Sequence, residues 1–169
     1  MIVIVCGLPG TGKTFFASAL ASRLNARLIS SDVVRTNLKR RGKYDEDNKN
    51  AVYAAMLLIL AEALQDHDSV VLDATFYKSA IRDLFTAKAR QYGEPFYFIQ
   101  LLASGKTIKE RMKQKRRDSE ADFDVYLKIK AAFEPLTERH LDLNSEEEQL
   151  QAMLSQALSF IRQTYHEIR

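Results

Sequence analysis

The sequence is poor in cysteine and contains no apolar run long enough to cross a membrane. Cys6 is the single cysteine among 169 residues, which excludes an internal disulfide framework and indicates a reducing compartment. The longest apolar stretch, residues 51–64, has 14 residues and includes Glu62, whereas a membrane span needs about 20. The residues before Gly7 are too few for a signal peptide, and no positive charge precedes them. We therefore expect a cytoplasmic protein without a membrane partner.

The composition is that of an ordinary globular protein. Hydrophobic residues make up 46% of the chain and charged residues 28%, a balance that excludes a disordered chain. A chain of this length corresponds to about one domain and can bury a core that is stable without disulfides. The sequence shows no repeat, low-complexity tract or interdomain linker. We expect a single domain over residues 1–169.

The positive charge is concentrated in two segments, although the net charge is only +3. Residues 106–117 contain seven basic residues and one acidic residue, and residues 35–43 contain five basic residues and no acidic one. These segments carry +6 and +5, so the rest of the chain carries a net −8. Such clustering indicates contact with an anionic partner, although two solvated helix faces would also account for it.

Apolar runs that end at turn residues alternate with stretches of helical spacing. This alternation predicts an α/β fold, an open five-stranded parallel sheet with helices on both faces. The predicted strands cover residues 2–6, 27–30, 69–73, 96–102 and, as the weakest, 139–143. The predicted helices cover residues 15–24, 32–40, 49–65, 79–92, 107–117, 123–133 and 146–167. Asp32 is expected as the N-cap of the second helix, and Ser145 with Glu148 as a capping box for the last.

The strongest motif follows the first predicted strand and opens a helix. It matches G-x-x-x-x-G-K-[S/T], the phosphate-binding P-loop, and has the required strand before it and helix after it. Glycines let backbone N–H groups converge on phosphate oxygens, and the helix dipole favours the same anion. We expect Lys13 to reach the β and γ phosphates and the Thr14 hydroxyl to bind Mg²⁺. The predicted nucleotide-binding residues of this loop are Gly7, Leu8, Pro9, Gly10, Thr11, Gly12, Lys13 and Thr14.

A second candidate pair, Asp32 and Arg35, follows the second predicted strand. The carboxyl ends of parallel strands face one crevice, so Asp32 should lie near the P-loop. There its carboxylate can accept the proton of an attacking hydroxyl. Arg35 shares the helix face and can hold an anionic substrate group. A helix N-cap with a local salt bridge would account for the same spacing.

The third predicted strand ends at Asp73, at a position typical of a Mg²⁺-assisting acid. The next residue is Ala74, whereas a hydrolytic motor usually places a water-activating Glu there. Residues 48–51 also fail to complete the guanine-reading Asn-Lys-x-Asp motif. These absences favour phosphate transfer to a hydroxyl over an ATPase motor or a GTPase switch. Phe76 and Tyr77 could stack on a base, although core packing would equally explain them.

The basic segment at about residues 106–124 is the predicted flap. A small kinase must exclude water and neutralise the migrating phosphoryl group, and a closing flap with arginines does both. We expect Arg111 to anchor the helix and bind the nucleotide, and Arg116 or Arg117 to reach the phosphates catalytically. A solvated basic helix remains the alternative.

Several of these motifs occur in the order known from one family. They are residues 7–14, Asp32-x-x-Arg35, Asp73-Ala74-Thr75 with Arg82 downstream, and residues 111–117 running into Ser119-Glu120-Ala121-Asp122. Over about residues 1–135 the chain resembles the small P-loop kinase group of polynucleotide 5′-hydroxyl kinases, gluconate-type kinases and zeta toxins, with an AAA_33-like ATP-binding domain. The Ser-Glu-Ala-Asp stretch also resembles kinase-like domains fused to aminoglycoside phosphotransferase-like domains.

This resemblance implies a P-loop NTPase fold of the three-layer, nucleoside-monophosphate-kinase-like type. It further implies that Asp32 is the general base, that Arg35 binds the phosphate beside the reacting hydroxyl, and that flap arginines bind the donor phosphates. Lys13, Asp32, Arg35, Arg116 and Arg117 are thus the predicted catalytic residues, with Thr14 and Asp73 at the metal.

We interpret the chain as a kinase that transfers the γ-phosphate of ATP, with Mg²⁺, to a hydroxyl acceptor. The favoured acceptor is a polynucleotide 5′-hydroxyl, with single-stranded nucleic acid as the partner. The first alternative is a small-molecule kinase acting on a sugar acid, a nucleoside or a similar alcohol. The second is a nucleotide-binding regulatory or toxin-like module that needs no small acceptor.

Overall fold

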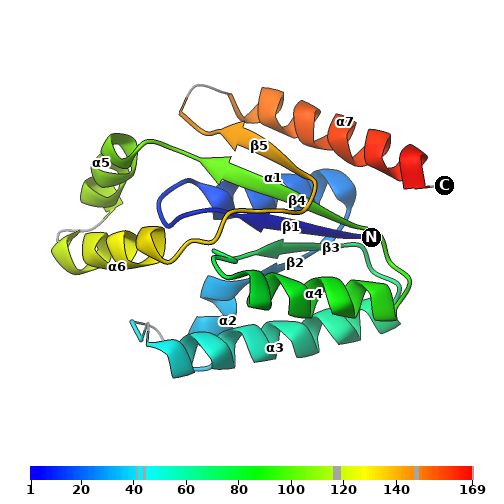
Figure 1. The fold of residues 1–169 in the computed structure, drawn as a ribbon, viewed down its shortest axis with the longest axis horizontal. Coiled ribbons are helices and arrows are strands. Elements are labelled where there is room, and N and C mark those ends of the chain that lie inside the picture. The colour runs from blue at the N-terminus through cyan, green and yellow to red at the C-terminus, as the bar shows by residue number, and fades with distance from the viewer. Residues whose placement is uncertain (41, 44, 116–118, 147–148, 169) are drawn as a thin grey trace.

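Five strands form one parallel sheet in the order β2-β3-β1-β4-β5 (Figure 1). They are β1 (Ile2–Cys6), β2 (Arg27–Ser30), β3 (Val70–Asp73), β4 (Phe96–Leu102) and β5 (His140–Asn144). The computed structural model describes residues 1–40, 42–43, 45–115, 119–146 and 149–168. The prediction of a five-stranded parallel sheet is therefore confirmed, including its weakest strand.

Helices connect the strands and cover both faces of the sheet. They are α1 (Lys13–Leu24), α2 (Ser31–Asn37), α3 (Glu46–Gln65), α4 (Ser79–Gln91), α5 (Gly105–Lys115), α6 (Ser119–Ala131) and α7 (Leu150–Ile168). In Figure 1, α3 and α4 lie on one face, α1 and α7 on the other, and α5 and α6 project beyond the carboxyl ends of the strands. None of the helices in the described part of the chain combines the length and apolarity that a bilayer crossing requires.

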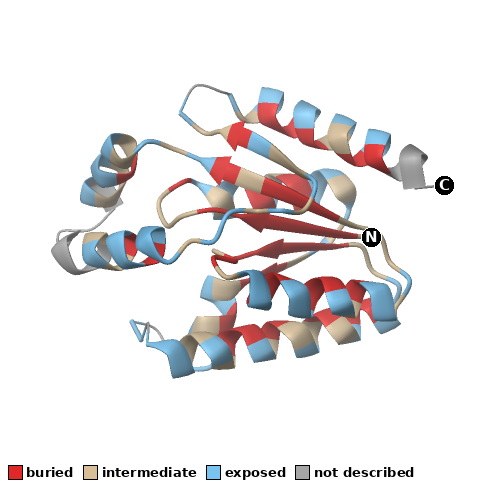
Figure 2. Cartoon of the chain, viewed as in Figure 1, coloured by how far each residue is buried: buried red, intermediate tan, exposed pale blue. Residues whose placement is uncertain are grey.

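The central strand β1 contributes to two hydrophobic cores because successive side chains point to opposite faces of a sheet. Ile2, Ile4 and Cys6 pack with apolar residues of α3 and α4, whereas Val3 and Val5 pack with α1 and α7. All five residues of β1 are fully buried, which Figure 2 shows as a continuous buried strand. β1 pairs with β3 on one side and β4 on the other, so the loop that follows it is held on both flanks.

Two predicted caps are wrong. The N-cap of α2 is Ser30, and Asp32 lies in the first turn with no capping role. The last helix begins at Leu150, so Ser145 does not open it; Glu148, its predicted partner, lies outside the described residues. In both cases the chain uses the candidate side chain for a tertiary contact or leaves it facing the cavity, which local spacing cannot reveal.

Candidate active site

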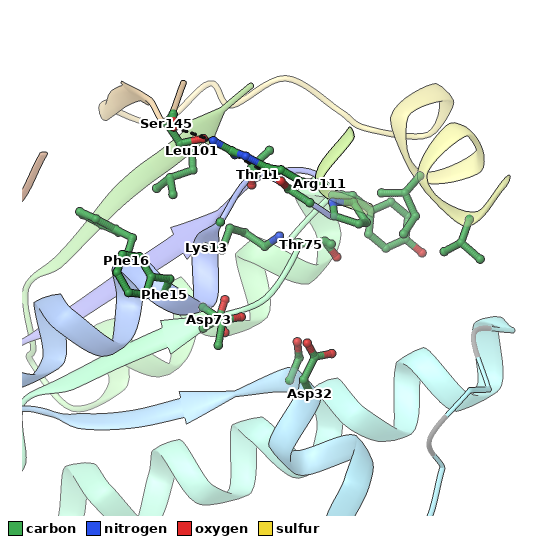
Figure 3. A pocket seen from close by; sticks show the side chains of 18 of the residues that line it. Thr11, Lys13, Phe15, Phe16, Asp32, Asp73, Thr75, Leu101, Arg111 and Ser145 are labelled. Atoms are coloured by element: carbon green, nitrogen blue, oxygen red, sulfur yellow. Dashed lines mark hydrogen bonds between the residues drawn. The ribbon is translucent and has the colours of Figure 1, made fainter. Parts of the chain in front are cut away.

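A cavity of about 670 Å³ lies at the carboxyl ends of the strands, where α/β sheets of this kind bind ligands. Its wall combines P-loop residues with residues from α2, α3, α5, α6 and α7 and from the ends of β3 and β4. Predicted site residues from four separate sequence segments meet there: Lys13, Thr14, Asp32, Arg35, Asp73 and Arg111. In the view of Figure 3, Arg111 and Asp32 lie at opposite sides of the cavity, with Lys13 and Asp73 between them.

The P-loop takes a backbone path that only glycine permits at its first residue. Gly7 has φ +136°, and a Cβ there would lie 2.4 Å from the carbonyl oxygen of Leu101, a distance that no packing adjustment of a backbone atom relieves. Gly12 has φ +89° and forms the N-cap of α1. Lys13 begins this helix, and its Nζ donates a hydrogen bond of 2.9 Å to the carbonyl of Leu8. The ammonium therefore lies across the loop, at a helix N-terminus that favours anions.

Asp73 is the most deeply buried acid of the cavity, with 2% of its surface exposed. The Ser30 hydroxyl donates to its Oδ2 at 2.9 Å, and the Thr14 side chain hydrogen-bonds to the same carboxyl. Burial raises the pKa of Asp73, while the charge of Lys13 and the two hydroxyls oppose that rise. Sequence reasoning missed Ser30, although the parallel register pairs Ser30 with Asp73 directly.

Thr14 and Asp73 supply hydroxyl and carboxylate oxygens, the ligand types that Mg²⁺ prefers. Three metal-ligating His, Cys, Asp or Glu side chains are not grouped anywhere in the described ranges. Mg²⁺ commonly uses one or two protein oxygens and takes its other ligands from phosphate and water. The chemistry of this donor pair therefore fits the predicted Mg²⁺ position.

Asp32 and Arg35 face the cavity from the first turns of α2. Asp32 is exposed and Arg35 is half-buried. Freed from capping, the Asp32 carboxylate lies at the cavity surface opposite the flap helices (Figure 3). The pair thus occupies the position from which an acceptor hydroxyl could be deprotonated and its substituents held.

Arg111 of α5 lies over the P-loop and is fixed by the loop before α7. Its Nη1 donates to Ser145 Oγ at 2.9 Å and to the Gly10 carbonyl at 3.4 Å, and its Nη2 donates to the Ser145 carbonyl at 2.7 Å. This contact explains why Ser145 is not a helix cap: its hydroxyl accepts from Arg111 and donates to the Leu102 carbonyl. Arg116 and Arg117 lie outside the described residues, so their predicted role stays a prediction.

One wall of the cavity consists of residues that sequence reasoning did not single out as functional. Lys49 and Tyr53 of α3 and Thr75 and Tyr77 after β3 line it. The Tyr53 hydroxyl lies 3.1 Å from Thr75 Oγ1 and accepts from the Phe76 amide at 3.2 Å. Spacing within α3 offers a signal in retrospect, since Lys49 and Tyr53 are four residues apart and share a helix face.

Phe76 and Arg82 serve the core. Phe76 is fully buried between the rings of Tyr53 and Phe85, so the stacking alternative does not apply to it. Arg82 is also fully buried, and its guanidinium donates to the carbonyls of Phe76, Glu134 and Pro135. This arginine therefore ties the segment after α6 to the sheet and does not line the cavity.

Apolar side chains line the cavity near its Arg111 side. Phe15 is 70% exposed and lies beside Leu150 and Met153 of α7 on the cavity wall. An exposed ring next to a phosphate-binding loop offers a flat apolar surface to a planar ligand. Its position directly after the motif is a signal that sequence reasoning did not use.

Comparison with known proteins agrees with this geometry. A family model described as an AAA domain matches residues 2–136. An L-seryl-tRNA(Sec) kinase from Methanococcus maripaludis is 30% identical over 87 residues, which are 50% of this chain and 34% of that protein. The chain therefore spans about a third of the length of this curated relative.

Solved structures share the fold over nearly the whole chain. A gluconokinase from Sinorhizobium meliloti has a TM-score of 0.78 at 19% identity, covering 98% of this chain and 94% of its own. The APS kinase of Mycobacterium tuberculosis, with AMPPNP and APS bound, has a TM-score of 0.71 at 16% identity and covers 95% of this chain and 96% of its own. Kti12 of Chaetomium thermophilum with ADP-AlF3 has a TM-score of 0.71 at 19% identity, covering 94% and 98%. The expected resemblance is confirmed: the chain belongs to the AAA domain family, AAA_33, and has the fold of the small P-loop kinases.

Proposed function

We propose that the chain is an ATP-dependent kinase that transfers the γ-phosphate of ATP to a hydroxyl acceptor. One observation carries this proposal: a single cavity joins a P-loop with Lys13 to an exposed carboxylate, Asp32, that has no capping role. The residue after Asp73 is a buried alanine, Ala74, and offers no group to activate water. The kinase relatives in sequence and structure support the same activity.

In the proposed reaction, Asp32 is the general base. Its carboxylate accepts the proton of the acceptor hydroxyl while that oxygen bonds to the γ-phosphorus. The bond from this phosphorus to the β–γ bridging oxygen breaks, so the products are the phosphorylated acceptor, ADP and the proton on Asp32. Lys13 and the P-loop amides stabilise the charge on the phosphoryl oxygens. Mg²⁺ held near Thr14 and Asp73 would supply further charge neutralisation.

The opposite wall would hold the donor. Arg111 reaches over Gly10 and is positioned to contact phosphate oxygens through its guanidinium, and Phe15 with Met153 would contact the nucleobase. The helices α5 and α6 contribute Arg111, Met112, Val125 and Ile129 to the cavity, which supports the proposal that this part of the single domain is the flap. Closure over the phosphates would exclude water from the reaction.

Transfer of radiolabel from ATP to a panel of alcohols tests the activity. A kinase should hydrolyse ATP slowly alone and accelerate when its acceptor is added. The Lys13→Ala variant should lose the acceptor-dependent rate. A protein that binds ATP with micromolar affinity but labels no acceptor of any class would instead support the regulatory-module alternative and overturn the kinase proposal.

A polynucleotide is the second candidate acceptor class. The observation that favours it is the basic segment next to the Asp32 side of the cavity, where Lys39 and Lys43 are exposed. The curated relative is named for a seryl-tRNA substrate, a hydroxyl on a nucleic acid. Arg40 is not available in the same way, because its Nη1 donates to Asn48 Oδ1 at 2.5 Å.

Salt dependence tests the polynucleotide alternative. Each neutralised phosphate of a single strand steepens the slope of log affinity against log salt by about 0.7. Binding of a labelled oligonucleotide should therefore weaken steeply with salt, and Lys39→Ala with Lys43→Ala should flatten the slope by about 1.4. The control is the pair Lys88→Ala and Arg90→Ala on α4, which should leave the slope unchanged. A shallow slope in the wild-type chain would remove the polynucleotide class.

A further inference from the structure

Lys49 holds a charged group in the wall of the cavity on the Asp32 side. Its side chain is only 17% exposed, although it belongs to the second turn of α3. The Nζ donates to Glu46 Oε1 at 3.0 Å and to the Tyr77 hydroxyl at 3.5 Å, and it lies 5.0 Å from the centre of the Tyr77 ring. An ammonium has three N–H groups, so these two partners among the described residues leave one donor for a ligand.

The contacts that fix Lys49 lie behind the cavity wall. Glu46 receives three groups: Lys49, the Tyr77 hydroxyl at 3.0 Å and Lys78 Nζ at 2.9 Å. The hydrogen bond from Lys78, followed by that from Lys49, lowers the pKa of Glu46 to about 2. Glu46 does not line the cavity, whereas Lys49 and Tyr77 do. The carboxylate therefore holds the ammonium in place without presenting negative charge to a ligand.

Lys78 shows that the same local contacts can exist without a place in the cavity. It binds the same Glu46 and lies 5.3 Å from the centre of the same Tyr77 ring. However, its side chain is 39% exposed and it does not line the cavity. The two lysines thus share one structural role, and only Lys49 adds a cation to the wall.

The charges on this side of the cavity are unbalanced. Among the described lining residues, Arg35 and Lys49 are cations on the α2–α3 wall, and Asp32 is the acid there. Lys13 and Asp73 lie together toward the P-loop and offset each other. Two half-buried cations that converge beside one exposed carboxylate favour an anionic ligand group, because charged groups out of water need a partner.

We propose that Arg35 and Lys49 form a two-pronged anion subsite for the acceptor. This inference rests on the proposed function, because it takes the Asp32 side of the cavity as the acceptor side. The acceptor is then an alcohol with a carboxylate or phosphate close to the hydroxyl that reacts. The anionic group binds between the two cations, and the hydroxyl points toward Asp32. Lys49 is in this role a residue that sets specificity, not one that performs the transfer.

Two sources can provide such an anionic group, and paired probes distinguish them. Gluconate against glucose tests a carboxylate on a polyol, and adenosine 3′-phosphate against adenosine tests a phosphate beside a 5′-hydroxyl. Each pair differs mainly in the anionic group. Binding of the probes is measured by calorimetry in the presence of a non-hydrolysable ATP analogue, and transfer is measured separately with labelled ATP.

We expect one anionic probe to bind at least tenfold more tightly than its neutral counterpart. Lys49→Met should reduce this preference about 10- to 100-fold, the worth of one hydrogen bond to a charged group, with the affinity for the ATP analogue unchanged. Lys49→Arg should restore most of the preference, because it returns the charge. Lys78→Met, the matched control that loses the same contacts to Glu46 and Tyr77, should change the preference less than twofold.

The outcomes separate this inference from the proposed function. Equal binding of both members of each pair by the wild-type chain would overturn the anion subsite, and so would equal losses in Lys49→Met and Lys78→Met. Tight and Lys49-dependent binding of an anionic probe without labelled product would keep the subsite and overturn the kinase proposal. Labelled product from neutral acceptors alone would keep the kinase and overturn the subsite.

Discussion

The two sides of the cavity are built by different means. The P-loop side is formed by backbone: Gly7 and Gly12 adopt left-handed conformations, and Lys13 lies at the start of a helix between buried strands. The Asp32 side is formed by side chains from α2 and α3, among them Arg35 and Lys49. Backbone amides can bind phosphate in any nucleotide, whereas side chains determine which acceptor fits.

This difference implies two kinds of tolerance to substitution. A changed side chain on the P-loop side should impair every reaction of the protein, because the donor is common to all acceptors. A changed side chain on the Asp32 side should alter which acceptor reacts, or how fast, with little effect on ATP. The predictions below test this division, and the largest expected effect comes first.

Lys13→Ala should give the largest loss. Removing a point charge from the phosphates should cost several kcal/mol of transition-state stabilisation, roughly a thousandfold in kcat/KM, for every acceptor alike. The measurement is labelled-phosphate transfer with two or more acceptors, and Lys88→Ala on α4 is the matched control. Loss for one acceptor and retention for another would contradict the assignment of Lys13 to the donor.

Asp32→Asn should lower kcat about 10²–10⁴-fold and leave the affinity for ATP unchanged. The amide keeps the shape of the side chain but does not accept a proton. Capping cannot account for such a loss, because Asp32 is not the N-cap of α2. Steady-state kinetics with ATP and acceptor varied in turn separate the two effects. Parallel losses in kcat and ATP affinity would place Asp32 on the donor side and break the division.

Asp73→Asn should raise the Mg²⁺ concentration for half-maximal rate roughly tenfold, as loss of one supporting metal partner does. The amide oxygen can still accept the Ser30 hydroxyl, so the fold should persist, which thermal unfolding checks. A normal Mg²⁺ titration with a raised acceptor KM would instead assign Asp73 to the acceptor.

Glu46→Gln should give the smallest effect, a modest loss of stability that depends on pH. The folded pKa of Glu46, about 2, lies below its ordinary value of 4.5. Its contribution is therefore fully present above about pH 5 and is lost as pH falls from 4.5 toward 2. Urea unfolding of both chains between pH 2 and 7 measures the difference. A stability difference that grows as pH falls would contradict the ion pairs around Glu46.

The sequence predicted most of the fold and the P-loop side of the site. Strands such as Ile2–Cys6 are continuous apolar runs, and the P-loop has a fixed spacing because few sequences follow its backbone path. The Asp32 side was predicted in part. Asp32 and Arg35 follow a strand end, which topology places at the cavity. Lys49 belongs to a helix that begins 16 residues after Ser30, and its place depends on how α3 packs against the sheet.

Some local assignments failed because tertiary partners competed for the same side chains. Ser145 has the spacing of a capping box but bonds to Arg111 and the Leu102 carbonyl. The Ser30 hydroxyl bonds to Asp73 on the neighbouring strand, a contact that sequence spacing does not contain. Such contacts arise from strand order, which is itself a result of folding.

The central place of β1 has a consequence for biosynthesis. The first strand and the P-loop leave the ribosome early, but β1 pairs only with residues 70–73 and 96–100. Non-local pairings of this kind form late, because a long loop must close before they contribute. At about 5–20 residues per second, the phosphate-binding loop therefore waits seconds for the two strands that flank it. Protease resistance of nascent chains of increasing length should accordingly appear as one step after β4 has emerged; a gradual rise before β3 would show that β1 does not need its neighbours.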